Sequence, residues 1–117
     1  MSRASAALAL VLALATAAPS RGIAAEPHIV RIVAKRFSYT PSEVRLKKGE
    51  PVILELVSED RIHGFNLPEF KIRKDVGPKE VTRVALTPDK AGTFSFRCDV
   101  FCGDGHEDMT GTLIVAE

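Results

Sequence analysis

A series of short, β-branched apolar segments separated by turn-forming residues constrains the fold of this chain most. The expected strands are residues 28–37, 43–46, 52–58, 70–74, 81–86, 93–98 and 110–116. Proline and glycine occupy the intervals between them, as in Gly49-Glu50-Pro51, and these residues favour turns. No segment predicts a helix longer than a turn or two. Short strands separated at regular intervals by turns predict an all-β sandwich of about seven or eight strands.

The first residues of the chain have the composition of an export signal. Arg3 is followed by a predominantly apolar run, residues 4–18, and then by a stretch of small residues. A basic start, a short apolar run and a small-residue exit are typical of a secretory signal peptide, and the run is short for a membrane span. An uncleaved anchor is the alternative. We expect residues 1–25 to be a signal peptide and residues 26–117 to be one periplasmic or secreted domain.

The charge of the expected domain is close to balance. Removing Arg3 and Arg21 from the 16 basic residues leaves 14, against 15 acidic residues. Such a balance predicts neither nucleic acid nor an anionic membrane surface as a partner. Beyond the leader, no apolar run is long enough to span a membrane. We therefore expect a monomeric domain with no transmembrane segment and a modest core.

Residues 98–109 concentrate the soft metal-binding side chains of the chain. Both cysteines, Cys98 and Cys102, lie here together with His106 and Met109. Thiolate, imidazole and thioether ligands suit copper, whereas zinc sites use other spacings and other ligands. The stretch therefore indicates a copper site that handles electrons. A Cys98–Cys102 disulfide is the alternative in an exported chain, but so short a bridge would remove little loop entropy.

A further ligand must come from elsewhere in the chain. His63 is the natural candidate, and it lies in residues 61–68, which we expect to be a loop after the strand at 52–58. Only the folded sandwich could bring it to the cysteines. His28, at the start of the first expected strand, is expected to be solvated instead.

Two copper sites are compatible with these ligands. A mononuclear blue-copper site takes two histidines, one cysteine and a weak axial methionine, and it would leave Cys98 unused. A binuclear site would use both thiolates as bridges and one imidazole on each ion, with Met109 and a backbone carbonyl completing the set. We prefer the binuclear site because it uses every soft ligand. The chain has no carboxylate pair, nucleophile–base set or phosphate loop, so we do not expect an enzyme.

The motif Cys-x-x-x-Cys-Gly-x-x-His-x-x-Met, with an upstream His-x-Phe-x-x-Pro, resembles the binuclear CuA domain of cytochrome c oxidase subunit II. That family has the cupredoxin fold, so the resemblance implies a Greek-key β-sandwich. The Val100-Phe101 pair also resembles the CuA domain of nitrous-oxide reductase. The matching residues are Phe65, Pro68, Asp75, Pro78, Gly92, Cys98, Cys102, Gly103, Gly105, His106 and Met109.

The resemblance implies a complete ligand set for two copper ions per chain. The two thiolates would bridge the ions, each imidazole would bind one of them, and the thioether and a backbone carbonyl would be weak ligands. The implied metal ligands are His63, Cys98, Val100 through its carbonyl, Cys102, His106 and Met109.

The chain also departs from oxidase subunit II. That subunit usually has a glutamate at the Val100 position, whose side chain helps to link a second metal at the catalytic subunit. It also has a transmembrane hairpin and a tryptophan for electron entry, whereas this chain has no tryptophan. The implied roles are a free electron carrier, a donor domain for a partner such as a c-type cytochrome or a copper enzyme, or a copper carrier for enzyme assembly.

Overall fold

The computed structural model describes Ala13 and residues 26–117, so the expected signal peptide lies, apart from Ala13, outside the described residues. The described chain forms nine strands and two short 3-10 helices. The strands are β1 (His28–Lys35), β2 (Ser38–Thr40), β3 (Glu43–Lys47), β4 (Val52–Ser58), β5 (His63–Leu67), β6 (Ile72–Val76), β7 (Thr82–Leu86), β8 (Gly92–Arg97) and β9 (Thr110–Ala116). The helices are η1 (Pro68–Phe70) and η2 (His106–Asp108). No helix in this part of the chain is long and apolar enough to cross a membrane.

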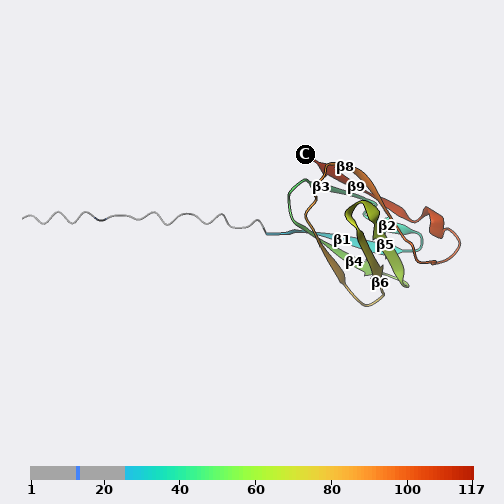
Figure 1. Ribbon diagram of the computed structural model, residues 1–117. Helices are drawn as coiled ribbons and strands as arrows, with labels where there is room; N and C mark the ends of the chain where they lie inside the picture. The colour runs from blue at the N-terminus through green and yellow to red at the C-terminus, as the bar shows by residue number, and fades with distance from the viewer. Residues whose placement is uncertain (1–12, 14–25) are drawn as a thin grey trace, which may run out of the picture.

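The strands pack as two sheets, which confirms the expected all-β sandwich (Figure 1). One sheet has the order β2-β1-β4-β7 and the other the order β3-β9-β8-β5-β6. The pairs β1–β4 and β3–β9 are parallel, and the other strand pairs are antiparallel. The loop between β8 and β9 lies at one end of the sandwich, and the C-terminus lies at the other (Figure 1).

Alternation of side chains builds the core between the sheets. In β4, Val52, Leu54 and Leu56 are buried, while the residues between them are partly exposed. In β9, Leu113 and Val115 are buried in the same way. Because successive side chains of a strand point to opposite faces, each strand contributes one apolar face to the core. This frame holds the β8–β9 loop at its end.

The structure corrects the expectation for the segment that contains His63. This segment was expected to be a loop, but His63 is the first residue of β5. Gly64 and Asn66 are weak strand formers, which hid the strand in the sequence. β5 pairs with β6 along its whole length and is buried on both faces except at Asn66, so tertiary pairing overrides local propensity. The short strand β2 was also missed, and β6 begins at Ile72 rather than residue 70.

Candidate metal centre

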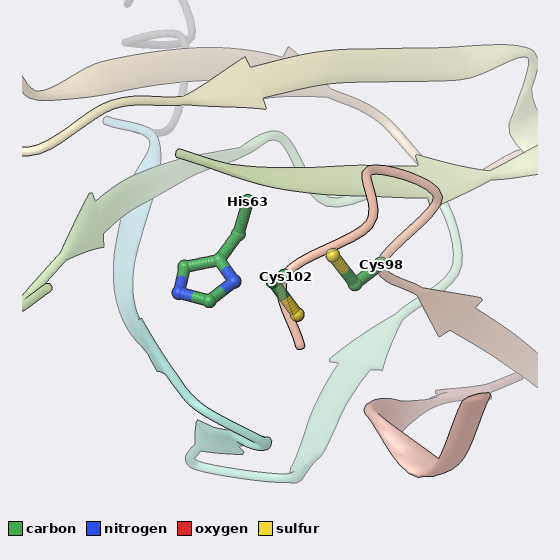
Figure 2. A group of neighbouring side chains, drawn as sticks. All are labelled: His63, Cys98 and Cys102. Carbon is green, nitrogen blue, oxygen red and sulfur yellow. The ribbon is translucent and has the colours of Figure 1, made fainter. Parts of the chain in front are cut away.

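Three buried side chains form the middle of the candidate site. His63 begins β5, Cys98 follows β8, and Cys102 lies in the β8–β9 loop. One potential ligand atom from each residue lies within 4.8 Å of the other two, and Figure 2 shows the three side chains gathered in one space. Both cysteines are free thiols, so the structure does not contain the alternative disulfide.

The β8–β9 loop is closed at its base and covered on one side. The backbone N–H of Cys98 donates to the carbonyl oxygen of Met109 at 3.1 Å, which joins the two ends of the loop. Gly103 and Gly105 have φ angles of 133° and 106°, a region that glycine adopts without strain. The ring of Phe37 lies over both glycines, so that a Cβ atom at either position would be 3.1–3.2 Å from it. These contacts fix the shape of the loop.

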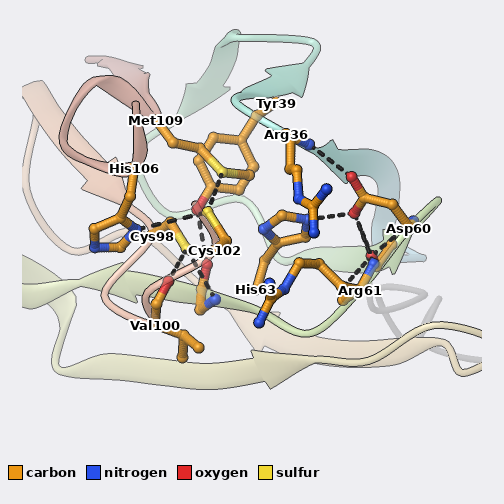
Figure 3. Close-up of polar contacts among 12 residues, drawn as sticks. Arg36, Tyr39, Asp60, Arg61, His63, Cys98, Val100, Cys102, His106 and Met109 are labelled. Atoms are coloured by element: carbon orange, nitrogen blue, oxygen red, sulfur yellow. Dashed lines mark hydrogen bonds and ion pairs between the residues drawn. The ribbon is translucent and has the colours of Figure 1, made fainter. Parts of the chain in front are cut away.

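The remaining predicted ligands face the same two thiols (Figure 3). The carbonyl oxygen of Val100 lies 3.2 Å from Sγ of Cys98. Nδ1 of His106 and Sδ of Met109 lie 3.6 Å and 4.0 Å from Sγ of Cys102. Met109 is fully buried, whereas His106 is partly exposed. The structure therefore brings all six predicted residues together, and their role as metal ligands stays a prediction.

The two ring nitrogens of His63 have different surroundings. Nε2 lies 2.6 Å from Oδ1 of Asp60, whereas Nδ1 is buried and has no hydrogen-bond partner in the described residues. An unpaired buried polar atom is costly, and it calls for an explanation such as an ion. With Nε2 held by the carboxylate, Nδ1 is the atom left to bind a metal beside the two thiols. A nitrogen and two sulfurs in a buried pocket fit copper.

Asp60 contacts the candidate ligand His63 and is a residue that the sequence analysis missed. Burial opposes its ionisation, but hydrogen bonds from the backbone N–H of Arg36, the His63 ring and the backbone N–H of Arg61 lower the pKa of Asp60 to about 2. An ionised carboxylate on the far nitrogen of a metal-binding histidine is a common arrangement that fixes the ring. The sequence signal that could have indicated this role is the position of Asp60, a carboxylate three residues before the candidate ligand His63.

The Cys102 thiol lies in surroundings that favour its neutral form in the absence of a metal. Burial raises the pKa of Cys102, and the neighbouring Cys98 raises it further. Two adjacent thiolates repel each other, and a cation between them removes that cost. Binding of a metal by the Cys102 thiolate would therefore release its proton.

Backbone contacts hold Cys98 against β5. The backbone N–H of Gly64 donates to Sγ of Cys98 at 3.3 Å, and the carbonyl of the same glycine accepts a 2.7 Å hydrogen bond from the Tyr39 hydroxyl. Burial, and next the charge of Cys98, raise the pKa of Tyr39, so the hydroxyl keeps its proton. The ring of Tyr39 also packs edge-on against Phe65 and Phe96. The sulfur thus sits beside a rigid aromatic cluster.

Apolar side chains reach the surface around this loop. Phe101 is 67% exposed, Ile62 is 50% exposed and Phe37 is 36% exposed. The Phe101 ring centroid lies 6.0 Å from that of His106. Three of the five large exposed apolar residues in the described chain therefore lie next to the candidate site.

The fold is that of the cupredoxin class. The model of the cupredoxin-like domain family matches residues 4–115. The chain belongs to the cupredoxin-like family, which confirms the fold that the ligand motif implied.

The chain is similar to two curated relatives and to one solved structure of that fold. It is 33% identical over 90 residues to cytochrome c oxidase subunit 2 of Thermus thermophilus, covering 77% of this chain and 67% of that protein. It is 37% identical over 90 residues to nitrous-oxide reductase of Ralstonia nicotianae, covering 74% of this chain but 14% of that enzyme. The chain thus spans only a small part of the reductase.

The solved structure shows the shared fold. The periplasmic domain of subunit II of cytochrome oxidase (CoxB) of Bradyrhizobium japonicum superimposes with a TM-score of 0.71 at 19% identity. The match covers 77% of this chain and 84% of that domain. This likeness of fold agrees with the cupredoxin-like family that the family model shows.

Proposed function

We propose that this protein transfers single electrons through a binuclear, CuA-like copper centre. The observation that supports the proposal most is the buried Nδ1 of His63, which has no hydrogen-bond partner in the part of the chain that the structure describes and lies beside two free, buried thiols. The chain's relatedness to oxidase subunit 2 and nitrous-oxide reductase agrees with it.

Each residue of the site has a distinct role in this proposal. Cys98 and Cys102 would bridge two copper ions, because both thiols are free and buried in the same cluster with His63. His63 and His106 would each bind one ion through Nδ1, the atom that faces the sulfurs. The Met109 thioether and the carbonyl of Val100 would be weak ligands, and their atoms already lie next to the thiols. Copper bound here would supply a one-electron redox couple.

The protein frame keeps the ligands in place and excludes water. Four of the six proposed ligands are 4% exposed or less (His63, Cys98, Cys102 and Met109). They are held by β5 and the end of β8, which belong to one sheet, and by a loop closed at its base. A rigid protein surrounding that excludes water limits how far the ligands move when copper changes its charge. It also tunes the reduction potential of the site. The chain itself carries out no bond chemistry in this proposal.

Electrons would enter or leave near His106, the only proposed side-chain ligand that is partly exposed. Exposed Phe101 lies beside His106, and exposed Phe37 lies against Gly103 and Gly105 of the same loop. These apolar side chains would form a small, transient contact with a redox partner. The exposed residues Asp104, Glu107 and Asp108 make the loop acidic, so a basic partner such as a c-type cytochrome would be steered to it. A copper enzyme is the other partner class.

Copper loading of the reduced protein tests this function. We expect about two copper ions per chain and a purple species with a delocalised mixed-valence EPR signal. We expect Cys98→Ser to abolish or convert that spectrum. One copper with a single-nucleus blue spectrum, unchanged by Cys98→Ser, would instead establish a mononuclear site. Binding of colourless Cu(I) alone would favour copper delivery.

Export is proposed from the leader composition. We propose that residues 1–25 are removed and that the domain works in the periplasm or outside the cell. The intact mass of the protein recovered from the periplasmic fraction tests this, because cleavage near Ala25 gives a defined loss. A full-length mass would support the uncleaved anchor.

A further inference from the structure

Arg73 and Asp99 form a two-point contact beside the candidate metal centre. Nε of Arg73 donates to Oδ2 of Asp99 at 2.9 Å, and Nη2 donates to Oδ1 at 2.9 Å. Arg73 lies on β6, the edge strand of its sheet, whereas Asp99 directly follows Cys98. A planar guanidinium that holds both oxygens of a carboxylate fixes direction as well as distance. The edge strand is thus tied to the first residue of the ligand loop.

The contact passes over Gly64, which lies in β5 between the two partners. A Cβ atom at Gly64 would lie 1.9 Å from Oδ1 of Asp99 and 2.9 Å from its backbone nitrogen. Only a residue without a side chain lets Asp99 lie this close to β5. Gly64 follows His63 in sequence, and its N–H contacts the Cys98 sulfur. The Asp99 contact therefore presses the cysteine end of the loop onto the histidine strand.

Regular strand pairing does little to hold these segments together. β5 and β8 share a single registered pair, Asn66 with Arg97, and β8 then ends. By contrast, β5 pairs with β6 over five residue pairs. Beyond Arg97, the side-chain contact from β6 replaces the missing ladder between the histidine strand and the cysteine loop.

We propose that Arg73 is a positioning residue for the metal centre and acts through Asp99. Its two hydrogen bonds fix the start of the ligand loop against β5. They thereby set the position of the Cys98 sulfur relative to His63. The proposal rests on the proposed function only for its effect on copper, because the effect on the loop is a property of the metal-free protein.

Three substitutions distinguish the geometry of the Arg73–Asp99 contact from the charge of the residues that make it. Arg73→Lys keeps the positive charge but loses the two-point contact, and Asp99→Asn weakens the same contact from the loop side. Asp75→Asn is the matched control, because Asp75 also accepts a hydrogen bond from Arg73 but lies on β6, away from the loop. All three side chains are partly exposed, so the fold should tolerate each change.

The first measurement is amide hydrogen exchange in the reduced, metal-free protein. The reporters are the amides of Gly64 and Cys98, which hold the sulfur and the loop base. We expect Arg73→Lys and Asp99→Asn to speed their exchange by about tenfold or more, and Asp75→Asn to leave it near the wild-type rate. Equal exchange in all four proteins would overturn the proposal, even if the wild type binds copper normally.

The second measurement is the reduction potential and EPR spectrum after copper loading. We expect Arg73→Lys to shift both more than Asp75→Asn does, although only the latter changes the net charge. A larger shift in Asp75→Asn would show that charge rather than position matters and would also overturn the proposal. A wild-type protein that takes up no copper would refute the proposed function alone, because the exchange result would still decide the role of Arg73.

Discussion

Nε2 of His63 lies 2.6 Å from Oδ1 of Asp60, while Nδ1 of the same ring faces the thiols (Figure 2) and has no hydrogen-bond partner among the described residues. The pair is three residues apart in sequence, and the side chain of His63 is fully buried whereas that of Asp60 is 34% exposed. The carboxylate therefore determines which nitrogen of the ring is left to bind a metal. It also places a negative charge behind the ring, which makes the imidazole a stronger ligand.

Removing this carboxylate should weaken copper binding. We expect Asp60→Ala to lower copper affinity by about 10–100-fold, because the His63 ring loses the contact that orients it. Competition with a Cu(I) chelator measures the change. Asp104→Ala is the control, because it removes an exposed carboxylate of the ligand loop and should leave the affinity within about twofold. Equal losses in the two variants would contradict an orienting role.

The lowered pKa of Asp60 predicts acid sensitivity of the metal-free protein. A carboxyl whose pKa falls from 3.8 to about 2 on folding stabilises the native state above the higher value. This contribution is lost as the pH falls from about 4 towards 2. Urea unfolding across this range should show a shallower loss of stability in Asp60→Asn than in the wild type. Parallel curves would show that the Asp60 contacts do not stabilise the fold.

The hydroxyl of Tyr39 should stabilise the protein through the backbone next to His63. Tyr39→Phe leaves the buried carbonyl of Gly64 without its 2.7 Å hydrogen bond, and we expect a loss of about 1–3 kcal/mol in the free energy of unfolding. Ser95→Ala, at an exposed position of β8, should change it by less than about 0.5 kcal/mol. Denaturant titration of the metal-free variants makes the comparison. An unchanged free energy of unfolding in Tyr39→Phe would mean that water replaces the hydroxyl as the hydrogen-bond donor to Gly64.

Phe101 should matter for the partner rather than for folding. Because its side chain is 67% exposed, Phe101→Ala should alter stability by less than about 0.5 kcal/mol. We expect it to slow electron exchange with a basic c-type cytochrome about tenfold or more, since it removes apolar contact area beside His106. Stopped-flow kinetics measure the rate, with Ile29→Ala as the control at an exposed apolar position near the start of β1, the end of that strand opposite to the one that leads to Phe37. Equal rates in the two variants would place the docking face elsewhere.

The sequence predicted the sandwich, which the structure confirms, and a set of copper ligands, which stays a prediction, because both rest on local signals. Strands such as β4 and β9 appeared as alternating or apolar runs bounded by turns, within one residue of their observed bounds. The Cys98 to Met109 stretch gave the chemistry of the donor set through its composition alone. By contrast, β5 was missed, because its glycine and asparagine make a poor strand in isolation.

Only the tertiary structure decided how these ligands are held. Which nitrogen of His63 is free depends on the position of Asp60, and the start of the ligand loop depends on Arg73 from a strand that is remote in sequence. Such contacts follow from strand order and register, which bring β5, β6 and the end of β8 side by side. Periodicity in one segment reports which face of that segment is buried, and it carries no information about which residue of another segment will lie opposite.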